Sequence, residues 1–282
     1  MEKNDIEILL QQVELADAIV VGAASGMSAA DGKDFWYRND ENFYRMFGDF
    51  YRKYGFTGAF NGFYYPYGSE ERRWAFLGRL GHHLHETKAG EAYQYLMELL
   101  KGKDYFVLTT NQDMLFHGLV PEERLSTIQG DWHYLQCGRP CHDKLYSSKE
   151  MLKKMNEAID ENLELPSGMV PRCPRCGAVM EPWVRGYHFL EGKKYKEEYE
   201  KWYDFVVTNQ KKKILFLELG VGRMTPMFIQ EPFWNFTYQL PQAFYITINP
   251  KHALLPEELT QKGLAIKEDI REVLAQAVEE KE

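Results

Sequence analysis

The sequence lacks the features that would place it in a membrane, outside the cell or on a nucleic acid. It contains no uninterrupted apolar run of about eighteen residues, so we expect no membrane-spanning helix. Residues 1–5 show neither the basic segment nor the apolar segment of a signal peptide. The formal net charge of −8 disfavours nucleic acids and anionic membrane surfaces as partners, because both need a basic face. We therefore expect a cytoplasmic protein.

Cysteine is scarce, and the four cysteines fall into two close pairs. The first pair is Cys137 and Cys141, and the second is Cys173 and Cys176, which flank a Pro-Arg turn. Tetrahedral Zn²⁺ takes four such thiolates, whereas two disulfides or four unrelated thiols are the alternatives. Because nothing marks the chain as secreted, the spacing favours zinc. A site closed by four thiolates is structural, so the chemistry is expected elsewhere.

Short apolar runs alternate with segments of helical periodicity. The runs at 16–21, 105–109, 125–128, 213–219 and 243–248 predict strands, most of them apolar enough to be buried on both faces. Apolar residues at helical spacing predict helices at 5–15, 74–100 (interrupted near 88–90), 149–164, 195–206 and 268–280. Such alternation predicts an α/β fold with a doubly wound parallel sheet.

Two segments interrupt this pattern and predict a second, smaller lobe. Residues 35–75 are crowded with aromatic side chains and glycines, and the cysteine pairs lie within 137–190. We expect residues 1–34, 92–136 and 191–282 to form a Rossmann-like domain. The helical, aromatic insert 35–91 and a zinc-ribbon module at 137–190 would form the small domain.

Small and polar residues follow several predicted strands. They are the loop 22–32, the pair Asn111 and Asp113, the turn 220–222, and Asn249. In an open parallel sheet the carboxyl ends of the strands form the ligand-binding edge, and small residues let backbone amides approach phosphate groups. Each feature alone is as well explained by a turn or a cap. Their occurrence at one edge of one sheet favours a ligand site.

With these residues in place, the chain resembles the sirtuin family over most of its length. Ala24-Ser25-Gly26-Met27-Ser28 corresponds to the family's Gly-Ala-Gly-x-Ser loop, and Thr109-Thr110-Asn111-Gln112-Asp113 corresponds to its Thr-Gln-Asn-Ile-Asp motif. Gln129-Gly130 stands at the family's His-Gly pair, and Gly220-Val221-Gly222 stands at its Gly-Thr-Ser turn. The cysteine knuckle from Pro171 to Gly177 and the pair Ile248-Asn249 also match the family pattern.

The resemblance implies that NAD⁺ is bound and cleaved at its nicotinamide–ribose bond, in a cleft between a Rossmann lobe and a zinc lobe. Asn111 would orient the ribose and nicotinamide, Asp113 would hold the carboxamide, and Asn249 would meet the adenosine ribose. The NAD-binding positions that it implies are Ala24, Ser25, Gly26, Ser28, Phe35, Thr110, Asn111, Gln112, Asp113, Gln129, Gly220, Val221, Gly222 and Asn249. The catalytic residues would be Asn111 and Gln129.

The departures from the family pattern bear on the reaction. Sirtuin deacylation needs histidine as a general base where this chain has Gln129, and an amide cannot take up a proton. His133 is the nearest histidine in the sequence, but past a turn we expect it to point elsewhere. The family's Asp-Phe-Arg loop is also altered, to Asp34-Phe35-Trp36.

Gln129 and the runs 26–32 and 217–222 make the chain similar to the class M sirtuins of microbes in particular. That resemblance implies a protein mono-ADP-ribosyltransferase that works beside a macrodomain hydrolase and modifies a lipoyl-carrying protein related to the glycine-cleavage H protein. A carboxylate or guanidinium of an acceptor can attack the ribose carbon without a base on the 2′-hydroxyl. A deacylase with a substituted base and an NAD⁺-binding regulator without turnover are the alternatives.

Overall fold

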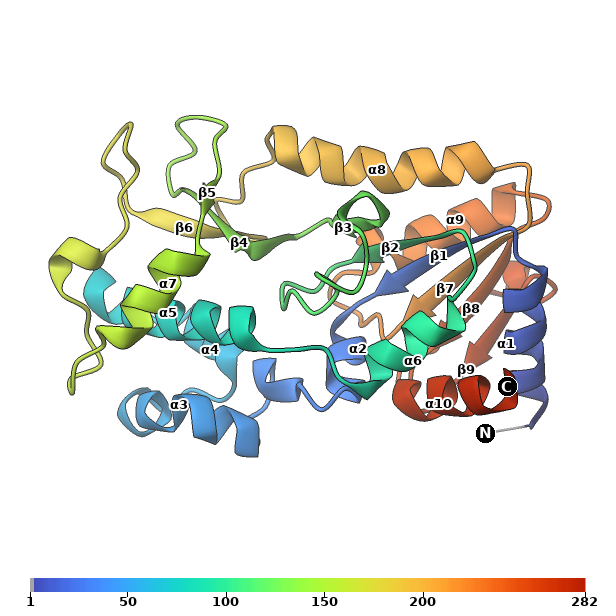
Figure 1. Cartoon of the computed structure of the whole chain (residues 1–282), viewed down its shortest axis with the longest axis horizontal. Helices are drawn as coiled ribbons and strands as arrows, with labels where there is room; N and C mark the ends of the chain where they lie inside the picture. The colour runs from blue at the N-terminus through green and yellow to red at the C-terminus, as the bar shows by residue number, and fades with distance from the viewer. Residues whose placement is uncertain (1–2, 282) are drawn as a thin grey trace.

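The structure is a computed structural model that describes residues 3–281, apart from the side chains of Lys3 and Phe35. Figure 1 shows two lobes side by side along the long axis of the molecule, with both ends of the described chain in the lobe that holds the parallel sheet. No helix between residues 3 and 281 combines the length and the apolar character needed to cross a bilayer.

The large lobe is built on a six-stranded, all-parallel sheet in the order β3-β2-β1-β7-β8-β9. Its strands are β1 (Ala18–Ala23), β2 (Tyr105–Thr109), β3 (Leu125–Thr127), β7 (Ile214–Leu219), β8 (Phe244–Ile248) and β9 (Gly263–Ile266). In chain order this is the 3-2-1-4-5-6 arrangement of dinucleotide-binding sheets, with the order reversing between β1 and β7. The predicted α/β, doubly wound, Rossmann-like fold is confirmed.

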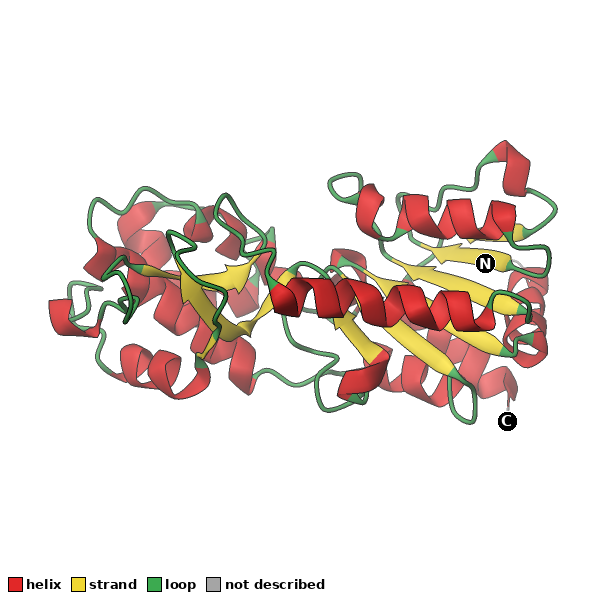
Figure 2. Ribbon diagram, turned by 90° about the horizontal axis from the view of Figure 1, so that it is seen from above, coloured by secondary structure: helices red, strands yellow, loops and turns green. Residues whose placement is uncertain are grey.

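Helices cover both faces of this sheet. One face packs against α1 (Lys3–Leu15), α6 (Glu91–Leu99) and α10 (Ile270–Lys281), and the other against α8 (Lys193–Asn209) and α9 (Gln230–Gln239). Figure 2, seen from above, shows α8 running from the junction of the lobes across the strands. Side chains from both layers bury every residue of β1 and β7, Glu218 included, as their largely apolar runs predict.

In the small lobe, the aromatic insert (35–91) and the segment that carries the four cysteines (137–190) share one hydrophobic core. It contains α3 (Glu41–Tyr54), α4 (Ala59–Phe63), α5 (Glu70–Glu86), α7 (Lys149–Glu157) and the antiparallel sheet β5 (Tyr146–Ser147), β4 (Gly130–Cys137) and β6 (Met180–Val184), in the order β5-β4-β6. Phe43, Phe47 and Trp74 of the insert pack there with Trp132 and Leu135 of β4. Strand β4 therefore brings residues from before the expected boundary at 136 into this core.

Several elements differ from the sequence prediction. The expected loop at 22–32 is the end of β1 followed by the short helix α2 (Ser25–Ala30), because alanine and serine accept helical geometry once the strand has ended. The helix expected at 149–164 ends at Glu157. Strand β9 and helix α9 were not predicted. The 3₁₀ segments in the described part are Asp34–Trp36, Glu122–Arg124, Ser167–Met169, Pro226–Phe228 and Glu257–Leu259.

Candidate active site

Two glycines meet where the strand order reverses. The Gly26 amide donates to the Gly220 carbonyl oxygen at 3.1 Å, and a Cβ built on Gly26 would lie 2.5 Å from the Gly220 Cα. Gly220 also has φ of +69°, a conformation that favours glycine. Only glycine at both positions lets the start of α2 and the end of β7 approach this closely. The two segments are therefore in backbone contact at the carboxyl edge of the sheet.

A cavity of about 440 Å³ opens at this edge and brings together most of the predicted site residues. Its lining includes Ala24, Ser25, Ser28, Thr110, Asn111, Gln112, Asp113, Gln129 and Gly222. The remaining wall is Lys33, Asp34, Trp36, Tyr37, Phe60, Phe63, Tyr64, Arg185, Met224 and Thr225. The cavity therefore has a polar floor from the large lobe and an aromatic wall from the insert.

Asn111, Ser28 and Asp113 form a hydrogen-bonded group on the floor. The Asn111 Nδ2 donates to the Ala24 carbonyl oxygen and to Ser28 Oγ, both at 3.0 Å, and the Ser28 hydroxyl donates to Asp113 Oδ2. Asp113 Oδ1 accepts from the Leu115 amide at 3.1 Å. Burial raises the pKa of the Asp113 carboxyl, and the hydrogen bonds from Ser28 and Leu115 counter only part of that rise. These contacts fix the plane of the Asn111 amide.

Gln129 and Arg185 line the same cavity, and each carries buried donor atoms without a hydrogen-bond partner among the described residues. Gln129 is 7% exposed, and its Nε2 is buried without a hydrogen-bond partner among the described residues. The same holds for Nε and Nη2 of Arg185, whose Nη1 donates to Glu191 Oε1 at 2.5 Å. The Arg185 amide also donates to the Gln129 carbonyl oxygen at 2.8 Å, which ties the two residues together. The Arg185 guanidinium also lies over the rings of Phe189 and Tyr195, at 4.4 and 5.2 Å from their centroids.

The four cysteines lie together in the small lobe, as predicted, and none of them lines the cavity. Cys137 Sγ lies 3.5 Å from Cys176 Sγ, and Cys141 Sγ lies 3.7 Å from Cys173 Sγ. Zinc–sulfur bonds of about 2.3 Å in a tetrahedron hold the sulfur atoms about 3.8 Å apart. No disulfide joins these cysteines. The set fits Zn²⁺ and leaves no ligand position free, so the zinc would be structural.

No family model matches the chain, but curated proteins do. A protein ADP-ribosyltransferase of Staphylococcus aureus (strain Mu50) is 33% identical over 276 residues, which cover 96% of this chain and 86% of the relative. A probable bifunctional ADP-ribose hydrolase/ADP-ribosyltransferase of Fusarium oxysporum f. sp. cubense is 32% identical over 240 residues, covering 82% of this chain and 40% of that protein.

Solved sirtuin structures share the fold. A structure on the basis of sirtuin substrate affinity matches 99% of both chains with a TM-score of 0.64 and 18% identity. Sir2Tm bound to a propionylated peptide matches 98% of both chains with a TM-score of 0.62 and 16% identity. The chain belongs to the sirtuin-type protein ADP-ribosyltransferases.

Some of the predicted NAD-binding residues do not line the cavity. Asn249 is one of them, and its side chain makes hydrogen bonds to the backbone. The Asn249 Nδ2 donates to the Val221 carbonyl oxygen at 2.9 Å, while Asn249 Oδ1 accepts from the amides of Lys251 and His252 at 3.0 Å. Val221 is 1% exposed. Asn249 thus holds the turn that follows Gly220 in place. The Phe35 side chain lies outside the described residues.

Arg185 is a site residue that sequence reasoning missed. It follows β6, and the pairing of Gly130 with Val184 across β4 and β6 places it beside Gln129. A single arginine near the end of a short strand carries no motif, so only the sheet pairing reveals it. His133 does not line the cavity, and its Nδ1 contacts Asp131 Oδ1 at 3.2 Å instead. It therefore does not supply the missing base from its place in this structure.

Proposed function

We propose that the chain transfers ADP-ribose from NAD⁺ to a protein acceptor as its native reaction. The observation that carries the proposal is that Gln129, which cannot act as a base, lines the cavity at the position where a deacylase needs a histidine base. Membership of the ADP-ribosyltransferase family supports the same reaction.

The cavity has features that fit NAD⁺. It lies at the carboxyl edge where the strand order reverses, which is where such sheets bind dinucleotides. Ala24, Ser25 and Gly222 are small and would let the pyrophosphate approach the backbone, and the side chains of Gln129 and Arg185 line the same space. When bound, NAD⁺ supplies a ribose carbon that becomes electrophilic as nicotinamide departs.

The chain's own groups would orient and hold the reacting parts. Asn111, fixed by the Ala24 carbonyl and Ser28, would orient the ribose, and Asp113 would hold the carboxamide. Gln129 can donate and accept hydrogen bonds but cannot take a proton from a ribose hydroxyl. The nucleophile would therefore come from the acceptor protein already ionised, as a carboxylate is at neutral pH. The guanidinium of Arg185 would attract an acceptor carboxylate or a cofactor phosphate.

Two further proposals concern the protein that accepts ADP-ribose and the enzyme that removes it again. From the resemblance to class M sirtuins, we propose a lipoyl-carrying protein related to the glycine-cleavage H protein as acceptor, and a macrodomain hydrolase as functional partner. The Fusarium relative supports the second part, because its name combines an ADP-ribose hydrolase with an ADP-ribosyltransferase.

The test compares protein labelling with deacylation. Wild type and the variants Gln129→Ala, Asn111→Ala and Gln242→Ala would be incubated with labelled NAD⁺, a lipoylated acceptor protein and an acetyl-lysine peptide. Gln242 is an exposed glutamine at the opposite edge of the sheet and serves as the matched control. We expect wild type and Gln242→Ala to label protein and leave the peptide intact. Asn111→Ala should abolish labelling.

Gln129→Ala should lower labelling by about tenfold to a thousandfold, because it removes a positioning hydrogen bond. Efficient deacetylation without protein labelling, while NAD⁺ is consumed, would show that the enzyme is a deacylase. Binding of NAD⁺ without release of nicotinamide in the presence of any acceptor would favour the regulator instead.

A further inference from the structure

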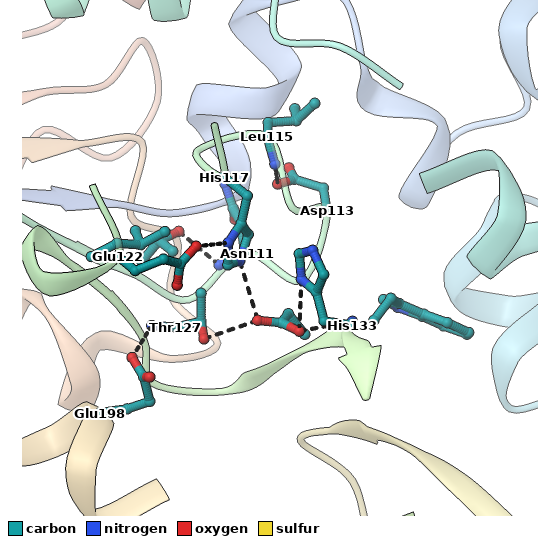
Figure 3. Close-up of polar contacts among 12 residues, drawn as sticks. Asn111, Asp113, Leu115, His117, Glu122, Thr127, His133 and Glu198 are labelled. Atoms are coloured by element: carbon teal, nitrogen blue, oxygen red, sulfur yellow. Dashed lines mark hydrogen bonds and ion pairs between the residues drawn. The ribbon is translucent and has the colours of Figure 1, made fainter. Parts of the chain in front are cut away.

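A second cluster of metal-ligating side chains lies behind the active-site loops. Among the described residues, two groups have ligand atoms that lie within 4.8 Å of one another: the four cysteines, and His117, Asp131 and His133. His117 belongs to the loop that follows β2, whereas Asp131 and His133 lie on β4. Figure 3 shows His117 and His133 turned toward the same point between the loop and the strand.

The spacing of the ligand atoms suits a shared ion. His117 Nε2 lies 3.2 Å from Asp131 Oδ2, and His133 Nδ1 lies 3.2 Å from Asp131 Oδ1. Charge-assisted hydrogen bonds of this kind are usually about 2.7–2.9 Å long. Metal bonds of about 2.0–2.2 Å, in contrast, place neighbouring ligand atoms about 3.0–3.5 Å apart. Two imidazoles and one carboxylate are also a common donor set for first-row metals.

His117 and Asp131 each have a hydrogen-bond partner that would fix the orientation of the side chain. In metal sites, such partners of the ligands are usually carboxylates or backbone groups. Glu122 Oε1 accepts from His117 Nδ1 at 2.8 Å, which would leave Nε2 of that ring as the metal-binding nitrogen. Asp131 is held by Thr127 Oγ1 at 3.2 Å and by the His133 amide at 2.8 Å.

The cluster is buried but can be reached by an ion. The side chain of Asp131 is 4% exposed, that of His117 17% and that of His133 37%. His85 lies nearby but is engaged, because its Nε2 contacts the Trp132 carbonyl oxygen at 3.1 Å and Ser148 Oγ at 3.0 Å. Three protein ligands leave at least one coordination position for water.

We propose that His117, Asp131 and His133 bind a divalent first-row metal ion, in a site separate from the four cysteines. The ion connects two active-site segments. The loop that carries Asn111 and Asp113 continues to His117, and Gln129 stands two residues before Asp131. One metal ion thus holds the two segments in register without touching the cavity.

The test measures metal stoichiometry with Zn²⁺ and Co²⁺ on the full chain. After the thiolate site is filled, wild type should bind one further equivalent by calorimetry. His133→Ala should lose this equivalent, and the exposed His188→Ala should retain it. Glu122→Gln should weaken it by about 10–100-fold, because it alters only the neighbour of a ligand.

No binding beyond the thiolate site in wild type, or a second equivalent that persists in His133→Ala, would overturn the proposal. X-ray absorption at the cobalt edge, on wild type with Zn²⁺ in the thiolate site and one further equivalent of Co²⁺, provides a second readout that does not depend on how the variants fold. The second equivalent should show nitrogen and oxygen ligands with the scattering of imidazole rings. Sulfur ligands for that equivalent would refute the assignment.

Discussion

Glu218 allows a quantitative test of how the sheet edge is built. It lies on β7 with no exposed surface, two residues before Gly220. Its Oε1 accepts from Thr247 Oγ1 and from Gln230 Nε2, both at 3.0 Å, and its Oε2 accepts from the Tyr245 hydroxyl at 2.8 Å. Burial raises the pKa of the Glu218 carboxyl from 4.5 to about 7, although these three hydrogen bonds oppose the rise.

The sign and size of the effect on stability follow from this pKa. Between pH 4.5 and about 7 the unfolded chain has released the Glu218 proton and the folded chain keeps it, so a rise in pH favours unfolding. The contribution of Glu218 is fully present below pH 4.5 and is lost as the pH rises through the folded pKa. At about 1.36 kcal/mol per pH unit, the loss amounts to about 3 kcal/mol.

Glu218→Gln isolates this contribution. The amide oxygen keeps the acceptor for Thr247 and Gln230, and the amide nitrogen donates to the Tyr245 oxygen where Oε2 accepts from the Tyr245 hydroxyl, but the amide does not titrate. Urea unfolding of wild type and variant, with zinc in excess, would be measured at intervals between about pH 4 and about pH 8. The free energy of unfolding of wild type, relative to the variant, should fall by about 3 kcal/mol over this range.

The exposed Glu200 on α8 gives a matched control, because Glu200→Gln should leave the pH dependence of wild type unchanged. Contributions common to all three proteins, including zinc binding, cancel in the comparison. Parallel curves for wild type and Glu218→Gln would refute the reasoning, since they would mean that folding does not raise the pKa of Glu218.

Two further changes test the remaining sites. Cys173→Ala should lose its zinc and lower Tm by on the order of 10 °C, because metal binding at such sites is folding free energy, and a metal-free variant with unchanged Tm would contradict this. Gly222→Phe should weaken NAD⁺ binding by about tenfold or more in calorimetry while Tm is kept, since a Cβ there meets open space within the cavity wall. Gly168→Phe, also at an open position, should leave the NAD⁺ affinity as it is in wild type.

The sheet could be predicted because its strands are short, apolar runs buried on both faces. The run at 105–109 coincides with β2, and the other predicted runs overlap β1, β3, β7 and β8. Strand β9 escaped prediction because it is a four-residue edge strand whose residues are mostly half-buried. Strand β4 escaped because a change of pairing register between Gly130 and Leu135 interrupts its alternation.

Some residues of the candidate site could also be predicted from the sequence, and others could not. Asn111, Asp113 and Gly222 could be named because each follows a predicted strand, and the carboxyl ends of parallel strands meet at one edge. The cysteine pairs could be named because their local spacing suits zinc. Asn249 also follows a strand, but the structure shows its side chain holding a turn rather than lining the cavity.

The sequence by itself determined the parallel sheet, the paired cysteines, the glycines at the sheet edge and the absence of a histidine at position 129. These properties are local, because burial, turn geometry and ligand chemistry are encoded by neighbouring residues. Only the tertiary structure placed Arg185 beside Gln129 and joined His117 to Asp131 and His133. Those contacts depend on the register of β4 against β6 and on the path of the loop after β2, which no local pattern of residues encodes.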